Sequence, residues 1–146
     1  IVVDSRPLME GRALLETLRE HGMDCTYIFL NAVSYVMKEV TKVFLGAAAL
    51  MSNGAVLSRV GTAGISLMAH SCNVPVLICC ETYKISNRVQ LESITGNELG
   101  NPLDVACVPG GAAHNQEDWW NMPNLNLLNL LYDLTPSEYV SGIVTE

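Results

Sequence analysis

The stretch "NVPVLICCETYK", residues 73–84, carries the clearest fold signal in the chain. Its apolar residues run without a break from Val74 to Cys80, whereas a strand with one face in water would alternate apolar and polar residues. An uninterrupted run of this length is typical of a strand buried on both faces, as in a parallel sheet. Similar runs occur upstream at residues 1–3, 26–30 and 42–45. Together they predict a sheet of several buried strands.

Helical patterns separate these runs. Between the first two, residues 7–22 place leucines at helical spacing, with Pro7 suited to the first turn and Gly22 to the C-terminal end. Asn31 can cap a short helix that ends at Val40, and "TAGISLMAHSCN" predicts another helix from Thr62. The alternation of strands and helices predicts an α/β, Rossmann-like layered domain with a mainly parallel sheet and right-handed crossovers.

The second half of the chain is less regular. The apolar run "LLNLLYD", residues 127–133, predicts a further strand. The Thr-x-x-Glu spacing of "TPSE", residues 135–138, predicts a final helix that has Pro136 at its first position. Residues 96–126 are rich in Asn, Gly and Pro and predict a long surface excursion. Its Trp119-Trp120 pair is expected to pin the excursion to the core, with a partner-facing anchor as the alternative.

Composition excludes several classes of protein. With 146 residues, 49% of them hydrophobic and 16% charged, the chain is a globular single domain. Eight basic against fifteen acidic residues leave no basic stripe, so direct nucleic-acid binding is not expected. No apolar run approaches the ~18 residues of a membrane span. Five cysteines without a C-x-x-C pair indicate a reducing, cytoplasmic location.

Ligands of α/β sheets bind outside the carboxyl ends of the strands. Residues 4–6, Asn31, 46–54 and 81–82 follow predicted strands, so we expect them at one rim. An arginine between a strand end and a helix start, as Arg6 is, suits a phosphate, the alternative being a local ion pair with Asp4 or Glu10.

The stretch "GAAALMSNGAVLSRVGT", residues 46–62, resembles a loop for a small anionic ligand. It contains an Asn-Gly dipeptide that predicts a hairpin turn. It has no carboxylate, histidine or cysteine that could act on such a ligand. G-x-G-x-x-G, P-loop and nucleophile-elbow motifs are absent from the chain. We therefore predict no catalytic residue, metal or cofactor, and a ligand cradle made of Arg6, Asn53, Gly54, Arg59, Gly61 and Thr62.

Four segments, taken in order, carry a family resemblance: "DSRPLMEGR", "NGAVLSRVGT", "VPVLICCETYK" and "YDLTPSEYVSGIVTE". They resemble the superfamily that contains methylthioribose-1-phosphate isomerase, ribose-1,5-bisphosphate isomerase and the alpha, beta and delta subunits of eukaryotic translation initiation factor 2B. The segments "LNAVSYV", "SRVGTA" and "NEL" are most similar to the delta members. The resemblance implies that residues 1–146 are a C-terminal Rossmann-like domain. The opening "IVV" and the abrupt end also suggest a fragment, which a helical domain and a polar extension would precede.

The resemblance also bears on catalysis. The catalytic aspartate of the isomerases falls on Ala48, and a second acidic position falls on Leu30. Their Asn-Lys pair falls on Ser58-Arg59, and a glutamine of theirs falls on Glu10. Alanine can neither donate nor accept a proton. General acid–base catalysis by such a group commonly raises the rate by about 10²–10⁴-fold. The resemblance thus implies an inherited cradle that is not a working active site.

As function, the resemblance implies a regulatory, non-catalytic subunit of the guanine-nucleotide exchange factor for initiation factor 2. The partners would be the beta subunit directly, alpha, gamma and epsilon within a decamer, and initiation factor 2, whose phosphorylation is sensed. Two alternatives remain open: a sugar-phosphate isomerase with a displaced acid, and a domain that only binds a sugar phosphate or nucleotide.

The leucine-rich stretch 125–134 predicts a partner surface. A strand buried by its own sheet accounts for about five of its apolar side chains, so some apolar surface is left over. We predict that Leu128 and Leu130, or their neighbours, contact the beta subunit, and that the isolated fragment self-associates weakly through the same surface.

Overall fold

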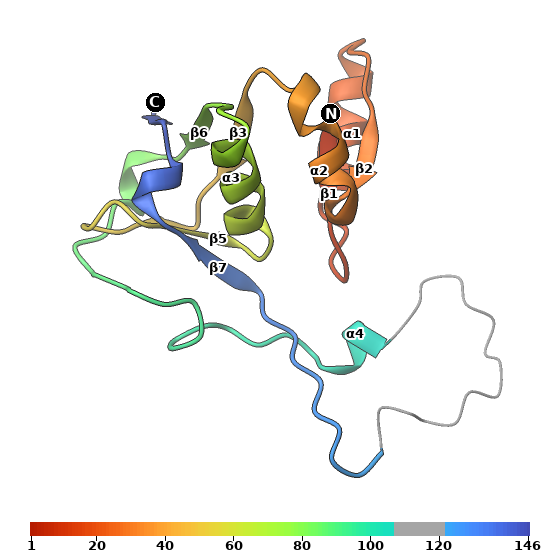
Figure 1. Ribbon diagram of the computed structural model, residues 1–146, viewed down its shortest axis with the longest axis vertical. Helices are drawn as coiled ribbons and strands as arrows, with labels where there is room; N and C mark the ends of the chain where they lie inside the picture. The colour runs from red at the N-terminus through yellow and green to blue at the C-terminus, as the bar shows by residue number, and fades with distance from the viewer. Residues whose placement is uncertain (107–121) are drawn as a thin grey trace, which may run out of the picture.

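The computed structural model describes residues 1–106 and 122–146 (Figure 1). Strands and helices alternate along most of the chain, which confirms the α/β class. The strands are β1 (Val2–Asp4), β2 (Tyr27–Phe29), β3 (Val43–Gly46), β4 (Ala49–Leu50), β5 (Val56–Arg59), β6 (Val76–Cys79), β7 (Tyr132–Thr135) and β8 (Gly142–Val144). The helices are α1 (Gly11–Glu20), α2 (Val33–Val36), α3 (Thr62–Ser71) and α4 (Leu103–Ala106).

Parallel pairing dominates the body of the domain. Strand β6 lies between β3 and β8 and is parallel to both, while β1 and β2 form a separate parallel pair. The side chains of Val76 and Ile78 are buried in the core together with Ala69 of α3. Leu77 is half-buried and Cys79 is exposed. Burial of β6 on both faces was therefore predicted wrongly, because within the described residues the core covers only the Val76–Ile78 face.

Strands β4, β5 and β7 form an antiparallel sheet. The Asn-Gly turn prediction is confirmed: β4 and β5 form a hairpin in which the N–H of Met51 donates to the carbonyl of Ala55 at 2.8 Å. Gly54 in this turn has φ +80°, a conformation that favours glycine.

The leucine-rich run forms much less strand than predicted. Strand β7 begins only at Tyr132 and pairs with β5. Residues 127–131 instead hydrogen-bond to residues 98–101, including an isolated bridge between Leu99 and Leu130. The buried Asn129 side chain donates to the carbonyl of Asn101 at 2.9 Å, so a polar group interrupts the apolar pattern. Residues 127–131 therefore lie beside residues 98–101 and do not join the parallel sheet.

The predicted final helix is wrong. Thr135 lies in β7, Pro136 has the extended ψ of 145°, and residues 137–139 form a single 3₁₀ turn that leads into β8. Residues 142–144 instead pair with β6 as strand β8, with Gly142 opposite Leu77. This pairing is favoured over the helix that the local capping signal predicts. The two upstream helices are confirmed with shifted starts: α1 begins at Gly11 rather than near Pro7, and the region after Asn31 is a mixture of 3₁₀ turns around α2.

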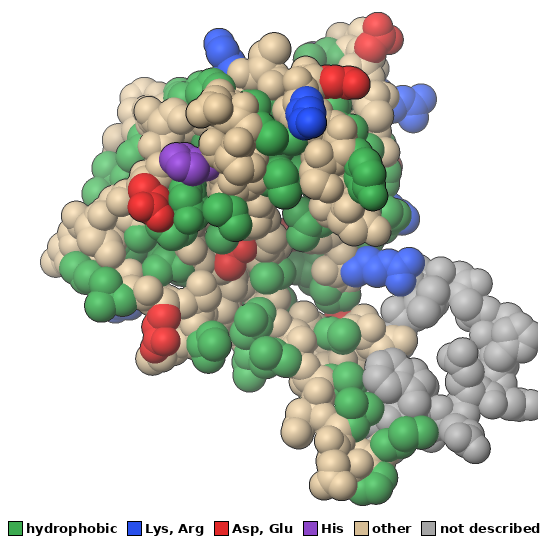
Figure 2. All heavy atoms as spheres, viewed as in Figure 1, with side chains coloured by type: hydrophobic (Ala, Val, Ile, Leu, Met, Phe, Trp, Pro, Cys, Tyr) green, Lys and Arg blue, Asp and Glu red, His purple; other side chains and the backbone are tan. Residues whose placement is uncertain are grey.

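A long arm leaves the body of the domain at the start of β7 (Figure 1). We define the arm as residues 93–106 and 122–131; most of its side chains are exposed, as expected of a surface excursion. Hydrophobic side chains lie on its surface in Figure 2. Trp119 and Trp120 lie outside the described residues. Among the described helices, none has the length and apolar character needed to cross a membrane.

Candidate functional site

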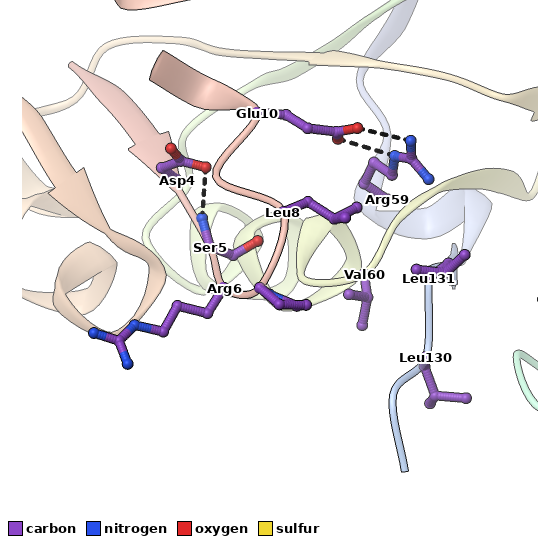
Figure 3. A pocket seen from close by; sticks show the side chains of 10 residues that line it. Asp4, Ser5, Arg6, Leu8, Glu10, Arg59, Val60, Leu130 and Leu131 are labelled. Atoms are coloured by element: carbon purple, nitrogen blue, oxygen red, sulfur yellow. Dashed lines mark hydrogen bonds and ion pairs between the residues drawn. The ribbon is translucent and has the colours of Figure 1, made fainter. Parts of the chain in front are cut away.

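The predicted cradle region contains a small hollow (Figure 3). The end of β1 supplies Asp4, the turn after it supplies Arg6 and Glu10, the end of β5 supplies Arg59, and the arm supplies Leu130 and Leu131. Its volume is about 40 Å³. Small-molecule sites usually measure about 300–1,000 Å³, so in this conformation the hollow is too small for a sugar phosphate.

Arg59, the cation that the sequence places in the cradle, is paired within the chain. Its Nε and Nη2 donate to the two carboxylate oxygens of Glu10 at 3.0 and 2.7 Å. Its guanidinium also lies 5.1 Å from the ring centroid of Tyr132. Figure 3 shows Arg6 pointing away from Arg59, so the two guanidinium groups do not converge on one point. Of the two acids expected as local partners for Arg6, Asp4 and Glu10, the second is bound to Arg59 instead.

The N-terminus of α3 is occupied by a carboxylate of the chain itself. Asp133 of β7 accepts hydrogen bonds from the Gly61 N–H at 2.6 Å, the Thr62 hydroxyl at 2.6 Å and the Ala63 N–H at 3.1 Å. Without Asp133, these donors at the positive end of the helix dipole would be free to bind the phosphate of a ligand. Asp133 is not among the residues predicted for the cradle. Its signal was an acid directly after the apolar run, in "YDLT".

The buried carboxylate at the hollow is Asp4, which is 5% exposed. It accepts hydrogen bonds from the Tyr27 hydroxyl at 2.6 Å and from the Ser5 N–H at 2.8 Å. Burial raises the pKa of Asp4, but these hydrogen bonds and one from Gly11 together outweigh burial, so its pKa lies below the ordinary value. Asp4 is therefore a hydrogen-bonded structural anion, poorly suited to act as a base near neutral pH.

The remaining cradle residues lie elsewhere. The Asn53 side chain accepts from the Ala55 N–H at 3.2 Å and donates to the Gln90 carbonyl at 3.2 Å. Gly54 faces Ser137, and neither residue of the turn lines the hollow. Of the six predicted cradle residues, Arg6 and Arg59 line it, while Gly61 and Thr62 hold Asp133. Ligand binding by this set stays a prediction.

The rim expected from the strand order is divided. Gly46 and Glu81 line a second, open hollow of about 500 Å³ at the ends of β3, β6 and β8. Because β1 pairs with β2 and β3 pairs with β6, the strand ends belong to two separate ladders. In this second hollow Lys84 and Glu81 form an ion pair at 2.7 Å, and burial raises the pKa of the Cys80 thiol. Among residues 1–106 and 122–146, no cluster of three potential metal ligands occurs.

The two positions matched to isomerase acids carry no titratable group. Ala48 is exposed, and its N–H donates to the Leu57 carbonyl at 2.8 Å. Leu30 packs against Gly61, where an added Cβ would come within 2.7 Å of the Leu30 Cδ2. Their assignment to the isomerase acids stays a prediction.

The two leucines of the predicted partner surface differ in environment. Leu128 is 62% exposed on the arm. Leu130 is half-buried and lines the small hollow, next to Val60. Leu128 therefore offers more exposed surface to a partner than Leu130 does.

The fold and site together define a layered α/β domain in which Glu10 pairs with Arg59 and Asp133 occupies the N-terminus of α3. The chain belongs to the initiation factor 2 subunit family, whose sequence model matches residues 1–146. It is 52% identical over 149 residues to translation initiation factor eIF2B subunit delta of Dictyostelium discoideum, covering all of this chain and 24% of that protein. It is 36% identical over 146 residues to ribose 1,5-bisphosphate isomerase of Pyrococcus furiosus, covering all of this chain and 43% of the isomerase.

Among solved structures, the tetrameric eIF2B-beta2-delta2 complex from C. thermophilum has a chain that matches with a TM-score of 0.75 and 25% identity. The match covers 97% of this chain and 40% of that one. The chain thus spans between about a quarter and less than half of the length of these relatives.

Proposed function

We propose that this chain is the C-terminal Rossmann-like domain of a regulatory, non-catalytic subunit of the guanine-nucleotide exchange factor for initiation factor 2. The observation that carries the proposal is its 52% identity to a delta subunit over its whole length, against 36% to an isomerase. Such a subunit acts in translation initiation and its control by phosphorylation of initiation factor 2, in the cytoplasm.

The state of the cradle supports a non-catalytic role. Glu10 neutralises Arg59, and Asp133 fills the N-terminus of α3. Ala48 and Leu30 supply no proton at the two positions matched to isomerase acids. A phosphate would have to displace two carboxylates of the chain and would meet their negative charge.

The proposed direct partner is a beta-type subunit, with alpha, gamma and epsilon in the same decamer and initiation factor 2 as its substrate. The solved relative from C. thermophilum contains beta and delta chains together, which supports the direct contact. We assign Leu128 and Leu130 to this contact. Two fully buried leucines contribute about 3–5 kcal/mol before the cost of association, and Leu128 has more area to bury than Leu130.

Binding of the full-length protein to a beta-type subunit tests the proposal. We expect the wild type to capture the beta subunit and Leu128→Asp to weaken capture strongly while the far-UV circular dichroism spectrum is unchanged. Leu67→Asp is the matched control, because Leu67 is a similarly exposed leucine, on α3. Absence of beta capture by the wild type would overturn the proposal.

The 36% identity to an isomerase supports a second candidate, a sugar-phosphate isomerase or a sugar-phosphate-binding domain. The filled cradle makes it the weaker one. Turnover of ribose 1,5-bisphosphate or methylthioribose 1-phosphate by the full-length protein would establish the isomerase. Calorimetric binding of these compounds without turnover would establish the binding domain.

A further inference from the structure

Tyr132 and Asp133 connect the cradle to the arm. Asp133 lies opposite Ser58 in the β5–β7 ladder and holds the first turn of α3 through three hydrogen bonds. The adjacent Tyr132 stacks against Arg59. One residue further back, the carbonyl of Leu131 accepts from the Val60 N–H at 3.1 Å. The residues at the base of the arm are thus bound to the loop between β5 and α3.

The same base holds the other half of the arm. The Asn97 side chain donates to the Tyr132 carbonyl at 2.6 Å and accepts from the Tyr132 N–H at 3.2 Å. Beyond it, the Gly100 N–H donates to the Asn129 carbonyl at 2.9 Å, and the Leu131 N–H donates to the Glu98 carbonyl at 3.1 Å. The two segments of the arm are therefore hydrogen-bonded to each other, and residues 131–134 connect them to the body.

The arm is attached to the body at residues 131–134, and Asp133 supplies side-chain hydrogen bonds at this attachment. Leu128 lies five residues before Asp133, within residues 122–131 of the arm, and is exposed. A small change of angle where the arm joins the body moves Leu128 by a larger distance. The Asp133 carboxylate holds the start of β7 to the first turn of α3, in addition to the backbone pairing of β7 with β5.

We propose that Asp133 is a positioning residue for partner binding: by capping α3 it holds the arm in the orientation that presents Leu128 to a beta-type subunit. This inference rests on the proposed function. The carboxylate does not touch the partner. It acts by fixing the start of β7 through its hydrogen bonds at the N-terminus of α3.

The physical cost of losing the anchor is specific. In Asp133→Ala the Gly61 and Ala63 N–H groups and the Thr62 hydroxyl lose their acceptor, while the β5–β7 backbone pairing has no side-chain component to lose. Hydrogen bonds to a charged group contribute more than neutral ones, and here they also complement the helix dipole. We expect the domain to stay folded and the arm to sample several orientations.

The test measures the affinity of the full-length protein for a beta-type subunit, with Asp133→Ala beside Asp24→Ala. Asp24 is an exposed aspartate between α1 and β2, so it controls for loss of one negative charge. At a temperature where circular dichroism shows all proteins folded, we expect Asp133→Ala to bind about tenfold more weakly and Asp24→Ala to bind as the wild type does. Added acetate, but not chloride at equal ionic strength, restores affinity to Asp133→Ala by supplying a carboxylate to the vacated donors.

Equal affinity of folded Asp133→Ala and wild type would overturn the inference while leaving the proposed function intact. Failure of the wild type to bind would overturn the proposed function instead. If Asp133→Ala does not fold, Thr62→Val removes a single donor and keeps the carboxylate. Weaker binding by folded Thr62→Val supports the positioning role, and unchanged binding contradicts it.

Discussion

Replacement of Gly61 by alanine tests the packing on which the cradle depends. Gly61 has φ +104°, and an added Cβ would come within 2.7 Å of the Leu30 Cδ2. The left-handed backbone costs an L-residue about 1–2 kcal/mol. Displacing the Leu30 side chain from its rotamer adds about 0.5–1.5 kcal/mol. We therefore expect Gly61→Ala to lower the free energy of unfolding by about 2–3 kcal/mol.

Gly64 offers a matched control in the same helix. Its added Cβ meets nothing within 4 Å, and it lies inside α3, where alanine is favoured over glycine by about 0.5–1 kcal/mol. Gly64→Ala is expected to stabilise the domain slightly. Urea denaturation followed by circular dichroism measures both, and with a slope of about 1–3 kcal/mol per molar the Gly61→Ala midpoint falls by about 1 M.

Two outcomes would refute this reasoning about Gly61. A Gly61→Ala protein as stable as the wild type would mean that neither the backbone conformation nor the Leu30 contact constrains this position. Equal losses in Gly61→Ala and Gly64→Ala would mean that α3 responds to any added methyl group. The double change Gly61→Ala, Leu30→Ala separates the two costs, since it removes the clash and keeps the backbone strain.

Three further measurements follow from the described residues. The Thr135 hydroxyl is buried and makes no hydrogen bond within the part of the chain that the structure describes, so Thr135→Val should raise the free energy of unfolding by about 1 kcal/mol in denaturant titrations. Because the pKa of Asp4 is lowered in the fold, its stabilisation is complete above the ordinary pKa of about 3.9 and is lost as pH falls through the folded value; Asp4→Asn should flatten the acid limb of a stability–pH curve. Iodoacetamide at neutral pH should modify the exposed Cys79 before the buried Cys80, whose pKa burial raises, and mass spectrometry of the peptides reports the order.

Much of the fold could be predicted from local patterns. The strand β6, the helices α1 and α3 and the Asn53-Gly54 hairpin all follow from signals within about ten residues of each element. The failures have a common cause. The run 127–133 and the capping signal at 135–138 describe what those residues favour alone, whereas their structure depends on hydrogen bonds to residues 98–101 and on pairing of β8 with β6.

The sequence by itself determined the class of fold and the family, because these depend on the order of residues along the chain. Only the tertiary structure decided what fills the cradle. Asp133 is 72 residues from Gly61 and reaches it because β7 pairs with β5, and Glu10 is 49 residues from Arg59. Local sequence cannot specify such contacts, since their geometry depends on the packing of separate strands. The carboxylates that close the cradle are therefore a property of the folded domain.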